Sequence, residues 1–555
     1  MKKRTGSMLV LASLLLSVTF AQAKVKNVIC LVPDGCDATV QTAARWYKGE
    51  ELQLDKMKLG AMKIHMANSI ITGSAAAATA FASGEKTTVR FLGIGASEDN
   101  YTNLKGHHSK TAPYAPMASI LEAAKLSGKA VGLVSTSRIT HATPAAFACH
   151  IQDRGWDNDI MEHLVYNNLT VAFGGGKRHL LTKDQGGKRT DGEDLLQVLM
   201  GKGYDFVETR DQLLALDSDK AWGMFASSHM DADMDRAEFN PTEPSIAEMT
   251  EKALEILAKD PDGFFIMIEG SQVDWAGHNN DPIYMVRDMI AFDDAVAAAV
   301  KFARENDNTL VVAFPDHNTG GMKIGHYTTP MPYTNTKIDD LVAPLKGMKI
   351  TANGVIEKMG GDYSEANFIA TVKEWWGLDI TAQDVADITD YSSQVGWSYA
   401  MARILSERYT IIGWSTHGHN GEDVPVWSYG KDSDLFQSTM DNTDLAKNMA
   451  QALGVSLDDA TQALYVDATE AFNYYTIDKT DAENVVLDID GYRFPEGKSI
   501  AIKGAQTWQL PGLNVYAPAT DKFYIAKAAV KYLKHLNVGD KAEVAEVSVD
   551  AADAE

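Results

Sequence analysis

Four short apolar runs constrain the fold of this chain more than any other feature. They are residues 28–32, 130–134, 264–268 and 310–314, each about five residues long and continuous rather than alternating. Such a run is typical of a parallel strand whose two faces are both covered. Helical patterns lie among them, over residues 117–126, 246–258 and 285–306. This alternation predicts a doubly wound α/β sheet of mostly parallel strands.

Acidic residues follow three of these four runs. Asp34 comes after the first run, Glu269 after the third, and Asp316 with His317 after the fourth. Sheets of this class bind ligands just beyond the carboxyl ends of their strands. We therefore expect these side chains to converge on cations at one edge of the sheet.

Further candidate ligands lie outside the strand ends. Asp274 and His278 are four residues apart, so on a helix they share one face. His419 stands in the Gly-rich turn 418–423, where the neighbouring His417 competes with it as a ligand. Imidazole and carboxylate donors without thiolate suit zinc in a catalytic site, with positions open for water or substrate.

Ser74 opens an alanine-rich stretch that favours helix. The ordinary interpretation is a helix-capping serine. The functional one is a nucleophile, since a helix N-terminus stabilises an alkoxide or a bound phosphoryl oxygen, and a nearby metal lowers the hydroxyl pKa. Arg154 lies eleven residues beyond Thr143 and could grip phosphate with its fork of donors, although a surface salt bridge is the default.

Taken together, these residues resemble the alkaline phosphatases from about residue 25 to about residue 430. The resemblance implies an α/β fold with a large central, mostly parallel sheet between helices, and a homodimer. It also implies two zinc ions and one magnesium ion, and hydrolysis of phosphate monoesters through a phosphoserine intermediate. It implies these site residues: Asp274, His278 and His419 for the first zinc; Asp34, Asp316 and His317, joined by Ser74, for the second; Asp34, Thr143 and Glu269 for magnesium; and Arg154 on the substrate phosphate.

The sequence departs from the family pattern at three positions. Gly73 stands where the family normally has an aspartate that helps to hold the arginine, so we expect Arg154 to be more mobile and phosphate to bind less tightly. His141 and Trp275 stand beside the third metal, where some members carry Asp and Lys and other members carry His or Trp. The third ion could therefore be zinc or cobalt instead of magnesium.

The ends of the chain and two additions complete the expected organisation. Residues 1–23 have the charged start, apolar run and small-residue cleavage site of a signal peptide. We expect a periplasmic or secreted protein without another membrane span, and one catalytic domain over 24–545. An insertion covers about 320–413, with helix near 365–376 and 397–408. Short antiparallel strands over about 478–521 precede a helix near 521–535, and 546–555 form an acidic tail.

Composition narrows the remaining choices. A net charge of −24 excludes a general affinity for nucleic acid. Three cysteines (Cys30, Cys36 and Cys149) make no disulfide framework, although one bond is possible.

The competing hypotheses for the function are a phosphodiesterase, or a sulfatase, of the wider superfamily, and a non-catalytic metal- or phosphate-binding homologue. Arg154 and a third metal site favour the monoesterase, since both serve the non-bridging oxygens of a monoester.

Overall fold

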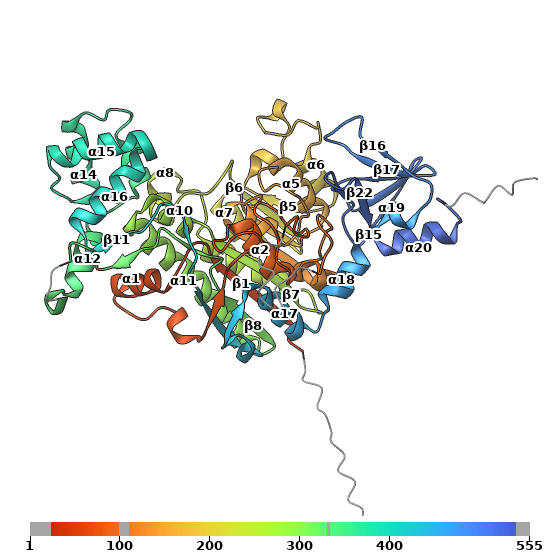
Figure 1. Ribbon diagram of the computed structural model, residues 1–555, viewed down its shortest axis with the longest axis horizontal. Helices are drawn as coiled ribbons and strands as arrows, with labels where there is room; N and C mark the ends of the chain where they lie inside the picture. Colours follow the sequence, from red (N-terminus) through yellow and green to blue (C-terminus); the bar gives the residue numbers. More distant parts are fainter. Residues whose placement is uncertain (1–23, 99–109, 330–332, 540–555) are drawn as a thin grey trace, which may run out of the picture.

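A ten-stranded sheet crosses the centre of the computed structural model, which describes residues 24–98, 110–329 and 333–539 (Figure 1). Its strand order is β14-β2-β13-β8-β1-β7-β3-β4-β6-β5. The outermost strands are β14 (Thr439–Asp441) at one edge and β4 (Val171–Gly175), β6 (Ala221–Ala226) and β5 (Asp205–Val207) toward the other. Every neighbouring pair is parallel except those of β13 (Val424–Gly430), which runs antiparallel to both β2 (Lys58–Lys63) and β8 (Thr309–Ala313). The predicted fold class is confirmed.

All four predicted strands form the middle of this sheet. They are β8, β1 (Asn27–Pro33), β7 (Phe264–Gly270) and β3 (Ala130–Arg138), in adjacent positions. Alternate residues of β1 enter two different cores: Ile29 and Leu31 face one, and Val28 and Cys30 face the other. Both faces need apolar side chains, which explains why the runs are continuous rather than alternating.

Helices cover each face. On one side lie α9 (Ile246–Leu257) and α11 (Pro282–Glu305), whose buried residues share a core with Ile29. On the other side lie α2 (Ser74–Ser83), α3 (Ile120–Leu126) and α17 (Asn442–Leu453). Burial of this apolar surface on both faces is the main force that holds the strand ends in place.

The insertion forms a helical group at one end of the molecule (Figure 1). Its helices are α12 (Ile338–Lys346), α13 (Ala352–Lys358), α14 (Glu365–Trp376), α15 (Ala382–Val395) and α16 (Trp397–Tyr409). Two short antiparallel ladders join its ends: β9 (Asn318–Thr319) with β12 (His419–Asn420), and β10 (Lys323–Ile324) with β11 (Ile412–Gly413). These five helices make the segment more helical than the sequence suggested. Trp376 and Phe368 are fully buried, which shows that the helices pack closely.

The C-terminal segment lies at the opposite end in Figure 1. It contains a five-stranded antiparallel sheet: β16 (Thr476–Asp478), β17 (Val486–Ile489), β18 (Tyr492–Pro495), β19 (Ile500–Lys503) and β20 (Gln506–Gln509). The helix expected near 521–535 is α20 (Lys527–His535), and residues before it form strand β22 (Lys522–Ile525). Phe523 and Ile525 face one core and Tyr524 another, which is the two-residue period of a strand.

The described residues include no helix long and apolar enough to cross a membrane. The proposed signal peptide, 1–23, and the acidic tail, 546–555, lie outside the described residues. The three cysteines are buried free thiols.

Candidate metal centre

The carboxyl ends of β1, β7 and β8 bring the predicted acidic residues together. Asp34, Glu269, Asp316 and His317 are all fully buried. The turn after β1 is drawn in tightly, since the Gly35 amide donates to Asp316 Oδ1 at 3.2 Å. Gly35 has a φ of +73°, and a Cβ there would lie 2.7 Å from the Asp274 backbone. Only glycine fits this turn, which keeps Asp34 against the other acids.

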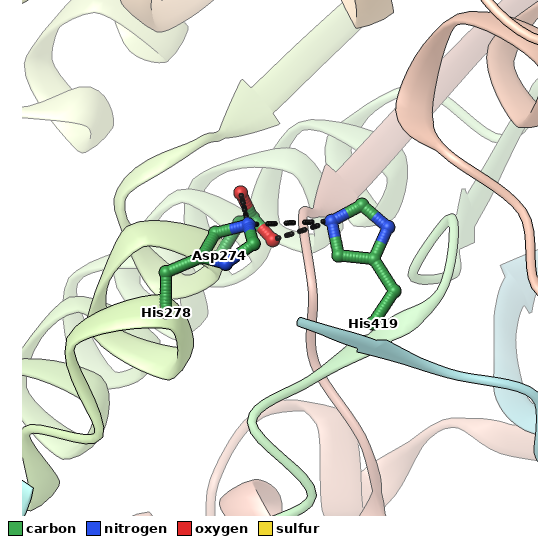
Figure 2. Close-up of side chains that lie close together, drawn as sticks. All are labelled: Asp274, His278 and His419. Atoms are coloured by element: carbon green, nitrogen blue, oxygen red, sulfur yellow. Dashed lines mark hydrogen bonds and ion pairs between the residues drawn. The ribbon is translucent and has the colours of Figure 1, made fainter. Parts of the chain in front are cut away.

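A first group of donors consists of Asp274, His278 and His419 (Figure 2). Asp274 and His278 project from the same face of α10 (Gln272–Asn279), with Asp274 Oδ2 3.4 Å from His278 Nε2. His419 Nε2 lies 3.3 Å from His278 Nε2 and 3.7 Å from Asp274 Oδ1. The predicted helical spacing therefore yields three donors around one point.

The geometry separates His419 from His417. The Nδ1 of His419 donates to the Thr72 carbonyl at 2.8 Å, which leaves its Nε2 lone pair facing the group. His417 instead uses both nitrogens elsewhere: Nδ1 donates to the His278 carbonyl at 2.7 Å, and Nε2 bonds with the Tyr391 hydroxyl at 2.9 Å. His417 thus braces the backbone of a donor residue and does not face the group.

A second group consists of Asp34, Asp316 and His317, with Ser74 beside it. His317 Nε2 lies 3.0 Å from Asp316 Oδ2 and 3.6 Å from Asp34 Oδ1. Ser74 Oγ lies 3.5 Å from the same nitrogen. Gly73 occupies the N-cap position and Ser74 is the first residue of α2, so the serine does not cap the helix.

A third group consists of Asp34, Glu269 and His141. His141 Nδ1 lies 4.0 Å from Glu269 Oε1, and its ring packs edge-on to that of Trp275. Thr143, expected here from the sequence, stands in the short helix α4 (Ala142–Ala145) directly after His141, and its hydroxyl is buried.

Arg154 approaches from the other side of His141. Its Nη2 lies 2.8 Å from His141 Nε2, and its backbone N–H donates to the Arg90 carbonyl at 3.0 Å. Among the described residues no carboxylate pairs with its guanidinium, in agreement with the absence of an acid at position 73.

The electrostatics of the three groups call for cations. Buried atoms without a hydrogen-bond partner in the described structure include both Asp34 oxygens, one oxygen each of Glu269 and Asp316, and the Thr143 hydroxyl. Burial, and then the charges of Asp316, Asp274 and Glu269, raise the pKa of Asp34 well above its usual value. Such unpaired, mutually repelling oxygens are costly unless metal ions neutralise them. The donor sets therefore fit divalent metals.

The surroundings of His278 and His419, the two histidines of the first group, shift their pKa values in opposite directions. Burial lowers the pKa of His278, but the hydrogen bond and charge of Asp274 together outweigh it and raise that pKa to about 9. Burial and the charge of His317 lower the pKa of His419 to about 4. The low pKa of His419 favours the neutral imidazole that ligates metals, whereas His278 would release a proton when a metal ion binds.

Several supporting residues were not found by sequence reasoning. Ser135 and Ser137 donate to Glu269 Oε2 at 2.6 and 3.3 Å, and Thr319 donates to Asp274 Oδ1 at 2.5 Å. The two serines come just after the predicted strand 130–134, so the rule that placed Asp34 and Asp316 at strand ends could also have found them. Thr319 carried no comparable signal.

Comparison with known proteins agrees with this geometry. The sequence model of the alkaline phosphatase family matches residues 25–455. The chain belongs to the alkaline phosphatase family. Alkaline phosphatase 3 of Bacillus subtilis is 34% identical over 78% of this chain and 90% of its own length. The chain is therefore an enzyme of this kind.

Solved alkaline phosphatases share the fold. The Thermus thermophilus enzyme has a TM-score of 0.69 at 27% identity, covering 79% of this chain and 95% of its own. A histidine-to-aspartate variant of the enzyme from the Antarctic bacterium TAB5, described with Mg bound in its M3 site, has a TM-score of 0.54 at 25% identity and covers 78% and 99% of the two chains. The family match ends at residue 455, so the C-terminal sheet lies beyond it.

Proposed function

We propose that this protein is an exported, metal-dependent phosphomonoesterase that releases inorganic phosphate through a phosphoserine at Ser74. The observation that carries the proposal is the place of Ser74. Its hydroxyl lies 3.5 Å from His317, beside buried carboxylates that lack partners, at the first residue of a buried helix. A helix N-terminus favours the negative charge of a phosphoryl group and of an alkoxide.

The three donor groups are the proposed metal sites. The first and second would each hold zinc, and the third would hold magnesium through Asp34, Thr143 and Glu269 with His141 nearby. Bound there, the ions would supply Lewis acidity and lower the pKa of water and of the serine hydroxyl. The magnesium-bound relative is a histidine-to-aspartate variant, and it supports a divalent cation at the third site. The imidazole of His141 is a donor better suited to zinc or cobalt than to magnesium.

The chain's own groups then account for the bond changes. Ser74 Oγ attacks phosphorus, the P–O bond to the substrate alcohol breaks, and the alcohol leaves with a proton. Water next attacks the phosphoserine, the P–Oγ bond breaks, and phosphate is released with Ser74 restored. Arg154 and the first amides of α2 balance the charge on the non-bridging oxygens in both steps.

Export and dimerisation complete the proposal. The signal pattern of residues 1–23 supports a periplasmic or secreted location. The family resemblance supports a homodimer. The substrates are small phosphate monoesters, with no nucleic acid partner required.

A phosphodiesterase of the same superfamily is the alternative. Arg154 and the third donor group favour the monoesterase, because both would serve the non-bridging oxygens of the substrate phosphate. Those oxygens carry more negative charge in a monoester than in a diester. Rates on an aryl phosphate monoester and on the matching diester separate the two functions, and a faster diester reaction contradicts our proposal.

The decisive test compares p-nitrophenyl phosphate hydrolysis by the purified chain, with zinc and magnesium, in wild type and Ser74→Ala. We expect the variant to lose at least about 10³-fold in kcat, since the nucleophile is absent. Ser83→Ala is a matched control: that serine ends the same helix and donates to the Thr79 carbonyl at 2.7 Å. Turnover indifferent to Ser74 would mean another nucleophile.

A further inference from the structure

A buried polar network lies outside the metal centre and joins three distant parts of the chain. His150 Nε2 lies 3.0 Å from Glu122 Oε1, and the Tyr465 hydroxyl lies 2.7 Å from that oxygen and 2.6 Å from His150 Nε2. The three residues are between 3% and 7% exposed. The second oxygen of Glu122 accepts from the Ser119 amide at 3.0 Å, so both carboxylate oxygens are bound. Buried networks this fully satisfied hold their members rigidly.

The network anchors the segment that carries Arg154. His150 Nδ1 donates to the Gly93 carbonyl at 2.8 Å. Ile151 then exchanges two backbone hydrogen bonds with Leu92, at 2.8 and 2.9 Å, and the Arg154 amide donates to Arg90. Residues 150–154 are thus fastened along residues 90–93, with His150 as the buried end of the contact.

Arg154 needs such an anchor more than an arginine with a carboxylate partner would. Gly73 offers no acid, and among the described residues the side-chain hydrogen bond of the Arg154 guanidinium goes to His141, not to a carboxylate. The position of the guanidinium therefore depends strongly on the position of its backbone. Small displacements of a substrate-positioning group have large effects on binding and rate.

Tyr465 brings the C-terminal segment into this arrangement. It stands ten residues beyond the end of the family match, at the C-cap of α18 (Leu457–Leu464). We propose that Tyr465 is a positioning residue for Arg154, acting through Glu122 and His150. The C-terminal segment thereby contributes to phosphate affinity. This inference rests on the proposed function of Arg154 as the phosphate-binding arginine.

The experiment measures the inhibition constant of inorganic phosphate, KM, kcat and the thermal midpoint for Tyr465→Phe in the metal-loaded enzyme. We expect the inhibition constant to rise about fivefold, because the hydroxyl that fixes His150 is lost. The matched control is Tyr166→Phe, another tyrosine next to the C-terminal segment, whose hydroxyl donates to Glu193 at 2.6 Å. We expect the control to change the inhibition constant less than about twofold at a similar loss of thermal midpoint.

A double-mutant cycle with Arg154→Ala distinguishes positioning from general destabilisation. In the Arg154→Ala background, Tyr465→Phe is expected to raise the phosphate inhibition constant by less than about twofold, since the group that Tyr465 positions is gone. A full effect of Tyr465→Phe without Arg154 overturns the inference, as does an unchanged inhibition constant in the single variant. If Arg154→Ala alone leaves phosphate inhibition unchanged, the proposed role of Arg154 fails instead. If Tyr465→Phe does not fold, His150→Gln takes its place in the same cycle.

Discussion

Replacing Gly73 with aspartate tests how the arginine of the site is held. Gly73 has φ −113° and ψ 162°, an extended conformation that any residue adopts. A Cβ at this position would meet no atom within 4 Å, so the aspartate enters without strain. The family resemblance implies that an aspartate at this position pairs with the guanidinium of Arg154, which has no carboxylate partner among the described residues.

The magnitude follows from the partial exposure of the pair. A solvent-exposed ion pair contributes about 0–1 kcal/mol and a hydrogen bond to a charged group about 1.5–3 kcal/mol. Arg154 lies between these extremes, so we take about 1 kcal/mol, which corresponds to about fivefold in a binding constant. Gly73→Asp should therefore lower the phosphate inhibition constant about fivefold. Where phosphate release limits turnover, kcat should fall by a similar factor.

The assay is competitive inhibition of p-nitrophenyl phosphate hydrolysis by inorganic phosphate. Gly73→Asn is the control, because asparagine has nearly the shape of aspartate but carries no charge and so cannot form the ion pair. Only the aspartate should tighten phosphate binding, since a side chain that instead capped the first amides of α2 would compete with phosphate for them. Equal inhibition constants in wild type and Gly73→Asp would refute the idea that the Arg154 guanidinium binds phosphate less tightly for want of a carboxylate partner.

Three further predictions concern the metals and the pH dependence of stability. Removal of divalent ions by a chelator should abolish turnover and lower the thermal midpoint, with both restored by zinc and magnesium; full activity in metal-free protein would contradict this. His419→Ala should lose one bound zinc by elemental analysis, whereas His417→Ala should keep it and weaken its affinity about tenfold; the reverse result would exchange their roles. Burial and the charge of Glu496 raise the pKa of Asp159 from 3.8 to about 6, so its contribution to folding stability is present below pH 3.8 and is lost as the pH rises through about 6. Asp159→Asn should therefore be more stable than wild type at pH 8 by about 1–3 kcal/mol in urea unfolding, and a less stable variant would contradict this. Asp157→Asn is the opposite case, because hydrogen bonds outweigh burial and lower the pKa of Asp157. This second variant should be less stable than wild type at pH 8.

The central sheet and the acid-bearing strand ends could be predicted because their causes are local. Strands buried on both faces need continuous apolar runs, and parallel strands end at one edge. Asp34, Glu269 and Asp316 follow from those two facts. Asp274 and His278 follow from helical spacing.

Other features depend on contacts between distant residues. The family resemblance named His419, but the orientation of the two rings depends on other parts of the chain: Thr72 holds the His419 ring with Nε2 toward the donor group, and Tyr391 bonds with Nε2 of His417. The Tyr465 contact with Glu122 spans 343 residues, and no pattern at either position points to it. Likewise, strand β22 forms because its alternate side chains enter two cores that the sequence does not reveal.

The antiparallel placement of β13 beside β8 has a consequence for how this enzyme can vary. Because neighbouring antiparallel strands can be joined directly, everything between Ala313 and Val424 is topologically one long hairpin loop. The pairs β9–β12 and β10–β11 form its stem, and His419 is part of that stem. Loop-closure entropy rises only as the logarithm of length, by about 0.6 kcal/mol per doubling. A change in the length of this loop therefore costs little loop-closure entropy. The helical group is nevertheless joined to the rest of the protein beyond the stem, because its buried residues share a core with α11 and Arg403 of α16 donates to Asn280 at the end of α10. A change in the group reaches the metal centre through α10, which carries Asp274 and His278, as well as through the stem beside His317.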